Sequence, residues 1–298
     1  MVGEIYLREE VEITDDLRWN LLQRKAAEHK ALGAFSLFRA HSIEPILIKG
    51  LAAARFYPDD KLRISVDMDL AVAANDYEAA LDISQSAEAR GLAIDVHREL
   101  RHLDTVPWDD LFSNSLLIEA EGGSIRVLRP EDHLRVLCVH WLNDGGAFHD
   151  RLWDMYFLVA NRPADFDWDR FLKTVSERRR RWLACSLGLA SRYIGLDLSG
   201  TPVEGEAKDI PAWIIRTVEH EWATGERHLP LDITLKDPKL LGKQILKRFR
   251  PNPIWATVEM EGSFDSRTRL HYQLGSIFHR AMPSFRRIIN AISDSISK

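Results

Sequence analysis

The chain has 298 residues, of which 45% are hydrophobic and 29% are charged, a composition typical of a folded globular protein and not of a disordered one. Its formal net charge of −5 gives no overall attraction to nucleic acid or to an anionic membrane. Two cysteines, Cys138 and Cys185, exclude a disulfide framework and a thiolate zinc site, and we expect both to be buried thiols of a cytoplasmic protein.

The sequence shows no sign of membrane insertion or export. Acidic residues lie within Met1–Glu10, where a signal peptide would carry an apolar run. The longest apolar stretches are far shorter than the roughly 20 residues that a membrane-spanning helix needs. We therefore expect no membrane partner.

The first part of the chain predicts a small sheet between helices. Apolar residues at three- and four-residue spacings predict a helix over 12–43, and Ile46-Leu47-Ile48 predicts a short strand that ends at Lys49-Gly50. Apolar and polar residues alternate over 64–72, which is typical of a strand. The other elements expected here are helices over 51–57 and 76–90, a strand over 94–97, and a hairpin of strands 115–120 and 124–128.

From Pro130 onward the pattern is mostly helical. The chain therefore predicts an α+β protein, with a small mixed β-sheet core, flanking helices and a following mostly α-helical domain. We divide it into an N-terminal helical segment that packs on the core (1–44), the α/β core (45–129) and the helical domain (130–298). Helices are predicted over 130–143, 149–161, 166–180, 182–194, 206–224, 237–249, 266–281 and 283–296.

Two carboxylates in the strand expected over 64–72 are the first candidates for chemistry. Asp67 and Asp69 are two residues apart, so in a strand they project from the same face at a Cα separation of about 6–7 Å. They would repel each other unless a cation lies between them, and oxygen ligands suit Mg²⁺ or Mn²⁺ better than zinc. The alternative is a strand whose polar face simply meets water.

Asp95 is the third candidate. It faces away from Ile94 and Val96 in its own strand, so adjacent strands would bring three carboxylates together. A third carboxylate can complete a second metal site or accept the proton of an attacking hydroxyl. Alternatively, Asp95 is a surface acid paired with Arg98 or His97.

Four further residues suit a phosphate group. Lys49-Gly50 follows a strand, where backbone N–H groups and a lysine can meet a phosphate and glycine permits close approach. Ser65 shares the expected strand face of Asp67, and Arg63 lies two residues earlier. The alternative is that Gly50 only makes the turn and Lys49 is solvated.

In this order and spacing, these residues resemble the nucleotidyltransferase superfamily with the DNA polymerase β-like fold, most closely its bacterial uncharacterised nucleotidyltransferase family. Members typically have a Leu-Lys-Gly turn, an Arg before Asp-x-Asp, an Asp-Leu-His strand, and a Pro-Glu-Asp helix followed by a His and an Arg…Asp pair. In this chain Leu51 follows the turn, where the superfamily commonly has Gly-Ser or Gly-Gly. The matching residues, within about 45–160, are Ile48-Lys49-Gly50, Arg63, Asp67-Met68-Asp69, Asp95-Val96-His97, Pro130-Glu131-Asp132, His140, and Arg151 with Asp154.

The resemblance implies a nucleotidyltransferase core over 45–129 and transfer of a nucleoside monophosphate from a nucleoside triphosphate, with ATP expected, to a hydroxyl or phosphate. It implies Mg²⁺ or Mn²⁺ at Asp67, Asp69 and Asp95, with Asp95 also activating the acceptor. The triphosphate would bind at Lys49-Gly50, Arg63 and Ser65. The acceptor (a small molecule, a peptide or protein, or RNA) and the oligomeric state stay open. Two alternatives are a toxin-like tRNA nucleotidyltransferase and a catalytically degenerate protein that binds nucleotide or a partner.

Two other groups of polar residues have structural interpretations. The basic run Arg178–Arg181 predicts either a path for RNA or a helix surface paired with nearby acids, and the negative net charge favours the second. His140 and His149, with Arg151 and Asp154, have contact spacings on a helix but no tight ligand motif, so we expect packing and internal ion pairs.

Overall fold

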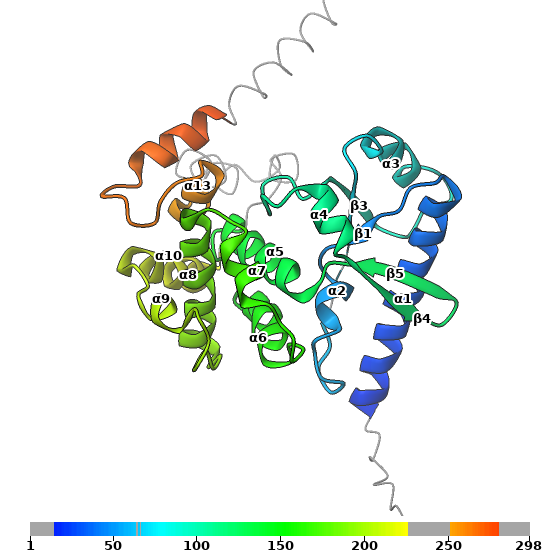
Figure 1. The fold of residues 1–298 in the computed structure, drawn as a ribbon, viewed down its shortest axis with the longest axis horizontal. Helices are drawn as coiled ribbons and strands as arrows, with labels where there is room; N and C mark the ends of the chain where they lie inside the picture. The colour runs from blue at the N-terminus through cyan, green and yellow to red at the C-terminus, as the bar shows by residue number, and fades with distance from the viewer. Residues whose placement is uncertain (1–14, 64, 66, 226–250, 280–298) are drawn as a thin grey trace, which may run out of the picture. The chain divides into compact units, whose positions relative to one another are not determined.

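The computed structural model describes residues 15–63, 65, 67–225 and 251–279 (Figure 1). These residues form two compact units. One contains the described residues of Met1–Glu99 together with Ser115–Val127, and the other contains those of Leu100–Asn114 together with Leu128–Lys298. The three-part division expected from the sequence stays a prediction.

The first unit is built on a five-stranded mixed sheet with the strand order β3-β2-β1-β5-β4. β2 (Met68–Val72) pairs in parallel with β3 (Ile94–Arg98) and antiparallel with β1 (Ile46–Leu47). β1 in turn pairs in parallel with β5 (Gly123–Val127), which forms an antiparallel hairpin with β4 (Leu116–Ala120). The sheet and its helices confirm the α+β prediction.

Helices α1 (Asp15–Ala40) and α3 (Tyr77–Ser84) contribute to the hydrophobic core of this unit. The short helix α2 (Leu51–Ala54) follows the Lys49-Gly50 turn. Side chains alternate along a strand. Every second residue of β2 and β3 therefore faces this core, and the residues between them project from the opposite face of the sheet. The buried core residues include Ala31, Ala34, Phe35 and Phe38 of α1 with Leu47, Leu70, Val72, Val96 and Val127 of the strands.

The second unit is helical. Its central helices are α5 (Pro130–Asn143) and α8 (Glu177–Ile194), which contact each other and several of the remaining helices. Among the described helices, none offers the long apolar surface that crossing a bilayer requires. The remaining elements are α4 (Trp108–Ser113), η1 (His149–Arg151), α6 (Leu152–Ala160), α7 (Trp168–Lys173), α9 (Glu204–Lys208), α10 (Ala212–Thr224), α13 (Pro253–Glu259) and a helical segment over 270–279.

The central helices bury both cysteines and are closely packed. Cys138 lies in α5 and Cys185 in α8, and burial raises the pKa of each thiol, that of Cys185 to about 12. Gly188 of α8 lies against α9, where an added Cβ would be 2.0 Å from the carbonyl oxygen of Ala207. Only glycine therefore allows these two backbones to approach so closely.

Several helix boundaries differ from the prediction. The helix expected over 206–224 is divided into α9 and α10 at Pro211, because proline cannot continue the hydrogen bonding of a helix interior. The short helices α4 and α13 were not predicted. The helices expected over 237–249 and 283–296 lie outside the described residues.

The basic run at the start of α8 is paired with acids and carbonyl groups. Arg179 is 3% exposed and forms an ion pair with Glu261, whose carbonyl oxygen accepts a hydrogen bond from Arg178. Arg180 pairs with Glu206, and Arg181 lies 2.9 Å from an oxygen of Asp209. These contacts support the ion-paired interpretation of the run.

Candidate metal and nucleotide site

The register of two parallel strands brings three polar side chains to one face of the sheet. In β2 and β3, Asp69 is the Cα partner of Asp95, and Ala71 is the partner of His97. The alternating residues Leu70 and Val96 are buried in the core on the other face. Asp69, Asp95 and His97 therefore project together from the face opposite α1.

These three side chains form a compact cluster. The His97 Nε2 atom lies 3.0 Å from Asp69 Oδ1 and 3.2 Å from Asp95 Oδ2. One ligand atom from each residue lies within 4.8 Å of the others. The Asp69 carboxylate is only 6% exposed and the Asp95 carboxylate is 57% exposed. The cluster thus has a buried side and a side open to solvent.

Lys49 approaches the same carboxylate from the end of β1. The backbone N–H of Ile48 donates to the carbonyl oxygen of Asp69 at 3.1 Å, which fixes the end of β1 beside β2. The Lys49 Nζ atom lies 2.5 Å from Asp69 Oδ1. Burial opposes ionisation of Asp69, but the hydrogen bond with His97 and the charge of Lys49 outweigh it and lower the pKa of the carboxyl to about 2. Asp69 is therefore ionised at neutral pH.

Asp67 lies outside this cluster. The strand expected over 64–72 begins at Met68, so that Ser65 and Asp67 precede it, while Ile64 and Val66 lie outside the described residues. The Ser65 hydroxyl donates to the carbonyl oxygen of Asp67 at 2.8 Å, a local bond that competes with strand pairing. Asp67 is exposed, and its membership of the metal site stays a prediction.

Gly50 has two reasons to be glycine. Its φ of +58° is a conformation that residues with a side chain rarely adopt. In addition, a Cβ at this position would lie 2.7 Å from Ser65 Oγ. The Lys49-Gly50 turn and the segment containing Ser65 therefore pack directly against each other.

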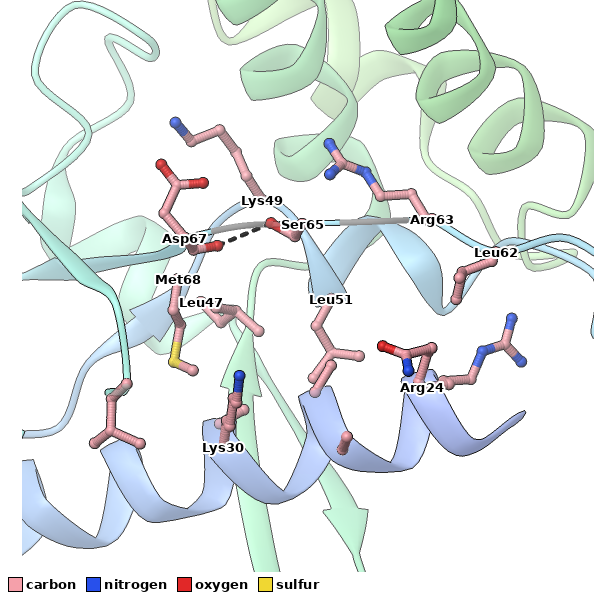
Figure 2. A pocket seen from close by; sticks show the side chains of 15 residues that line it. Arg24, Lys30, Leu47, Lys49, Leu51, Leu62, Arg63, Ser65, Asp67 and Met68 are labelled. Carbon is pink, nitrogen blue, oxygen red and sulfur yellow. Dashed lines mark hydrogen bonds between the residues drawn. The ribbon is translucent and has the colours of Figure 1, made fainter. Parts of the chain in front are cut away.

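Beside this turn the unit has a cavity of about 140 Å³ (Figure 2). The charged ends of Lys49, Arg63 and Asp67 lie on the side away from α1, whereas Leu51 and Met68 extend towards α1. All the residues expected to bind phosphate except Gly50 line this cavity. The complete lining is Gln23, Arg24, Ala26, Ala27, Lys30, Ala31, Leu47, Lys49, Leu51, Leu62, Arg63, Ser65, Asp67, Met68 and Leu92.

A family model described as an uncharacterised nucleotidyltransferase matches residues 10–195, more than half of the 298-residue chain. The chain belongs to this family. The resemblance inferred from the sequence is thereby confirmed. Comparisons with curated proteins and with solved structures find no match.

Nucleotidyltransferase families generally use a divalent cation, and the Asp69–Asp95–His97 cluster is a candidate for holding one. Two carboxylate oxygens and one imidazole nitrogen lie close enough to share an ion. Carboxylates suit Mg²⁺ and Mn²⁺, and an imidazole suits transition metals better than Mg²⁺. Asp69 is ionised, and Asp95 is accessible from solvent. The donor set could therefore hold a divalent cation, and its imidazole would suit a transition metal.

His97 is the member of this cluster that the sequence did not single out as a candidate ligand. In the sequence it had two readings: the His of the family's Asp-Leu-His strand and a neutralising partner for Asp95. The available signal was its spacing, because residues 95 and 97 share a strand face. What the sequence could not show was the register that puts both side chains beside Asp69.

The Pro-Glu-Asp segment of the family lies within the match and stabilises the helical unit. Pro130 is the first residue of α5. The buried Glu131 accepts hydrogen bonds from the backbone of Asp167 and from Arg129. Asp132, also buried, accepts from Arg135 and Arg170. Both acids thus hold segments of this unit together.

The downstream polar residues of the match take part in an ion pair and in packing. Arg151 pairs with Asp144, and its guanidinium lies 3.0 Å from Nε2 of His140. Asp154 is buried at 3% exposure. His149 packs edge-on against Trp222. These contacts agree with packing and internal ion pairing.

Proposed function

We propose that this nucleotidyltransferase moves a nucleoside monophosphate from a nucleoside triphosphate to an acceptor hydroxyl or phosphate in the presence of Mg²⁺ or Mn²⁺. The observation that carries the proposal is the Asp69–Asp95–His97 cluster, which joins a buried and an exposed carboxylate on paired strands. Family membership gives this cluster its reaction class. ATP is the expected triphosphate.

The cation would be held by Asp69, Asp95 and His97, with Asp67 as a further expected ligand. When bound, it supplies positive charge against the triphosphate. Asp69 is suited to this task because its low pKa keeps it ionised. Asp95 is suited because its carboxylate is 57% exposed and can meet an incoming substrate.

The phosphates would be bound by the residues around the Lys49-Gly50 turn. Lys49 and Arg63 provide positive charge at the cavity, and Gly50 allows the turn its positive φ of +58°. The Ser65 hydroxyl donates a hydrogen bond to the carbonyl oxygen of Asp67. A contact from Ser65 to phosphate therefore requires its hydroxyl to rotate.

The transfer step balances without any other reactant. An acceptor oxygen forms a bond to the α-phosphorus, the bond from that phosphorus to the α–β bridging oxygen breaks, and pyrophosphate leaves. The proton of the acceptor hydroxyl passes to the Asp95 carboxylate, which can release it to water because of its exposure. Asp95 is thus proposed as both ligand and base.

A second candidate is a nucleotide- or partner-binding protein without turnover. It is favoured by the position of the Lys49 ammonium group, 2.5 Å from the carboxylate that would bind the cation. Leu51 after the turn, in place of a serine or glycine, supports it further. A toxin-like tRNA nucleotidyltransferase would share the first mechanism and differ only in its acceptor.

The test is to incubate the full chain with α-labelled nucleoside triphosphates, Mg²⁺ or Mn²⁺, and cell extract. Label transfer and pyrophosphate release are then compared for the wild type and Asp95→Asn. Asp82→Asn is the matched control, because it makes the same change at an exposed position of α3 outside the site. Transfer by the wild type and Asp82→Asn, with loss in Asp95→Asn, supports the proposal.

Two outcomes count against it. Equal transfer by Asp95→Asn would remove Asp95 from the reaction. Nucleotide binding with cation, seen as thermal stabilisation but with no pyrophosphate released for any acceptor, would favour the second candidate.

A further inference from the structure

One face of α1 changes its environment along the helix. Ala34, Phe35 and Phe38 of this face are fully buried against the sheet. At the same three- and four-residue spacings towards the N-terminus, the face continues with Gln23, Ala26, Ala27, Lys30 and Ala31, which line the cavity. This part of the face carries three alanines, with Gln23 and Lys30 beside them, and no aromatic side chain. Ala26 and Ala27 therefore add little bulk to this wall of the cavity.

Apolar side chains form much of the cavity wall. Opposite the alanines of α1 lie Leu51, Leu62 and Met68, with Leu47 and Leu92 completing the apolar lining. Figure 2 shows Leu51 and Met68 extending towards α1. The volume of about 140 Å³ is close to the ~150 Å³ of an apolar cavity that accepts benzene. The cavity therefore has room for a ring system but not for a whole nucleotide.

The charges of the lining favour an anionic ligand. Four cationic side chains, those of Arg24, Lys30, Lys49 and Arg63, accompany a single carboxylate, Asp67. Two of these cations are paired with acids outside the lining, Arg24 with Asp59 at 2.6 Å and Lys49 with Asp69 at 2.5 Å. A ligand with a ring that has apolar faces and with a polyanionic end matches this arrangement.

The cavity is continuous with the proposed phosphate site, because Lys49, Arg63, Ser65 and Asp67 belong to both. We infer that the cavity takes the nucleobase of the substrate triphosphate, held between the alanine face of α1 and the side chains of Leu51, Leu62 and Met68. Gln23, with one amide donor group and one acceptor, and Lys30 lie where they can contact the polar edge of the base. This inference rests on the proposed function, and it makes α1 part of the substrate site.

The experiment fills the cavity from α1 and separates base from phosphate. Ala27→Leu adds bulk to the wall at little cost to the helix, because leucine is a good helix former. Ala40→Leu is the matched control, since it makes the same change at an exposed position of the same helix away from the cavity. Dissociation constants are measured by calorimetry with Mn²⁺ for the four common ribonucleoside triphosphates and for inorganic tripolyphosphate, which has no base.

For the wild type we expect the best triphosphate to bind at least tenfold more tightly than tripolyphosphate. Ala27→Leu should remove most of this advantage and leave the tripolyphosphate constant within twofold, while Ala40→Leu changes neither. If Ala27→Leu does not fold, judged by circular dichroism, Ala26→Leu at a more exposed position makes the same test.

Three results would overturn the inference. They are equal binding of triphosphates and tripolyphosphate by the wild type, unchanged triphosphate binding in the folded cavity variants, and an equal loss for both ligands. If these appear while label transfer persists, only the nucleobase assignment fails. If the wild type binds neither ligand in the presence of cation, the proposed function fails as well.

Discussion

Two clusters of acidic side chains among the described residues differ in their partners. In the helical unit, Asp104 and Asp132 are fully buried and contact the guanidinium of Arg135, which is 1% exposed. On the sheet, the buried Asp69 contacts Lys49 and His97, and the neighbouring Asp95 is 57% exposed. The first cluster is closed by arginines, whereas the second is open on one side.

The partners explain what each cluster can do. Arginine offers a rigid planar set of donors, and Arg170 adds two contacts to Asp132 of 2.9 and 2.8 Å. In this closed network burial still raises the pKa of Asp104, despite the charge of Arg135. The Asp69 carboxyl has a pKa lowered to about 2, with a flexible lysine and an imidazole as partners. A closed network stabilises the fold, and an open one remains able to bind a ligand.

The largest expected effect comes from opening the closed network. Arg135→Met removes the guanidinium between Asp104 and Asp132 and leaves both carboxylates buried without it. Loss of one partner of a buried ion pair typically destabilises a protein by about 3–5 kcal/mol. Urea denaturation should therefore show a strongly reduced midpoint. A change below about 1 kcal/mol would contradict the structural role of this network.

In the open cluster on the sheet, a substitution should change stability little and weaken cation binding strongly. Asp95→Asn should change the free energy of unfolding by no more than about 0.5 kcal/mol, because exposed positions tolerate substitution. Cation affinity, measured by Mn²⁺ titration, should fall at least tenfold because a charged ligand is lost. A stable variant with undiminished Mn²⁺ binding would show that the cluster is not a cation site.

A smaller effect concerns the choice of ion. Because His97 offers a nitrogen ligand, the cluster should bind Mn²⁺ more tightly than Mg²⁺. His97→Gln should weaken Mn²⁺ binding severalfold. It should also reduce the difference between the Mn²⁺ and Mg²⁺ dissociation constants, as measured by calorimetry. An unchanged preference would assign His97 the role of orienting Asp69 alone.

The smallest effect tests an acid of intermediate burial. Burial opposes ionisation of Glu44, but the hydrogen bonds from Arg39 and Arg126 outweigh it and lower the pKa of its carboxyl below the ordinary 4.5. The folded state thus gains stability above pH 4.5 and loses it as the pH falls below that value. Glu44→Gln should make the acid-induced loss of unfolding free energy less steep. Equal slopes in chemical denaturation between pH 5 and about pH 3 would contradict this assignment.

Local patterns predicted the elements that have strong signals of their own. Helix 130–143 was predicted with the bounds of α5, because Pro130 and the following acids mark a helix start. The hairpin around Gly122-Gly123 was also found. The strand over 64–72 was predicted too long, because alternation does not reveal that the hydroxyl of Ser65 bonds the backbone of Asp67.

The two carboxylates of the cluster were predictable from the sequence, but the side chains that contact them were not. Asp69 and Asp95 were expected to meet, and they are paired residues of adjacent strands. The contact of Lys49 with Asp69 depends on where β1 ends, and the contact of His97 depends on strand register. Both are long-range properties, so no short sequence pattern contains them.

The register between β2 and β3, which pairs five residues of each strand, also limits how this site can change during evolution. Deleting one residue before β3 would exchange inward and outward side chains along the whole strand, so that Asp95 would turn towards the core and Val96 towards the open face. Such a deletion would damage folding together with the site. Relatives that lose activity and remain folded should therefore differ by replacements at positions 69, 95 and 97, and not by gaps beside them.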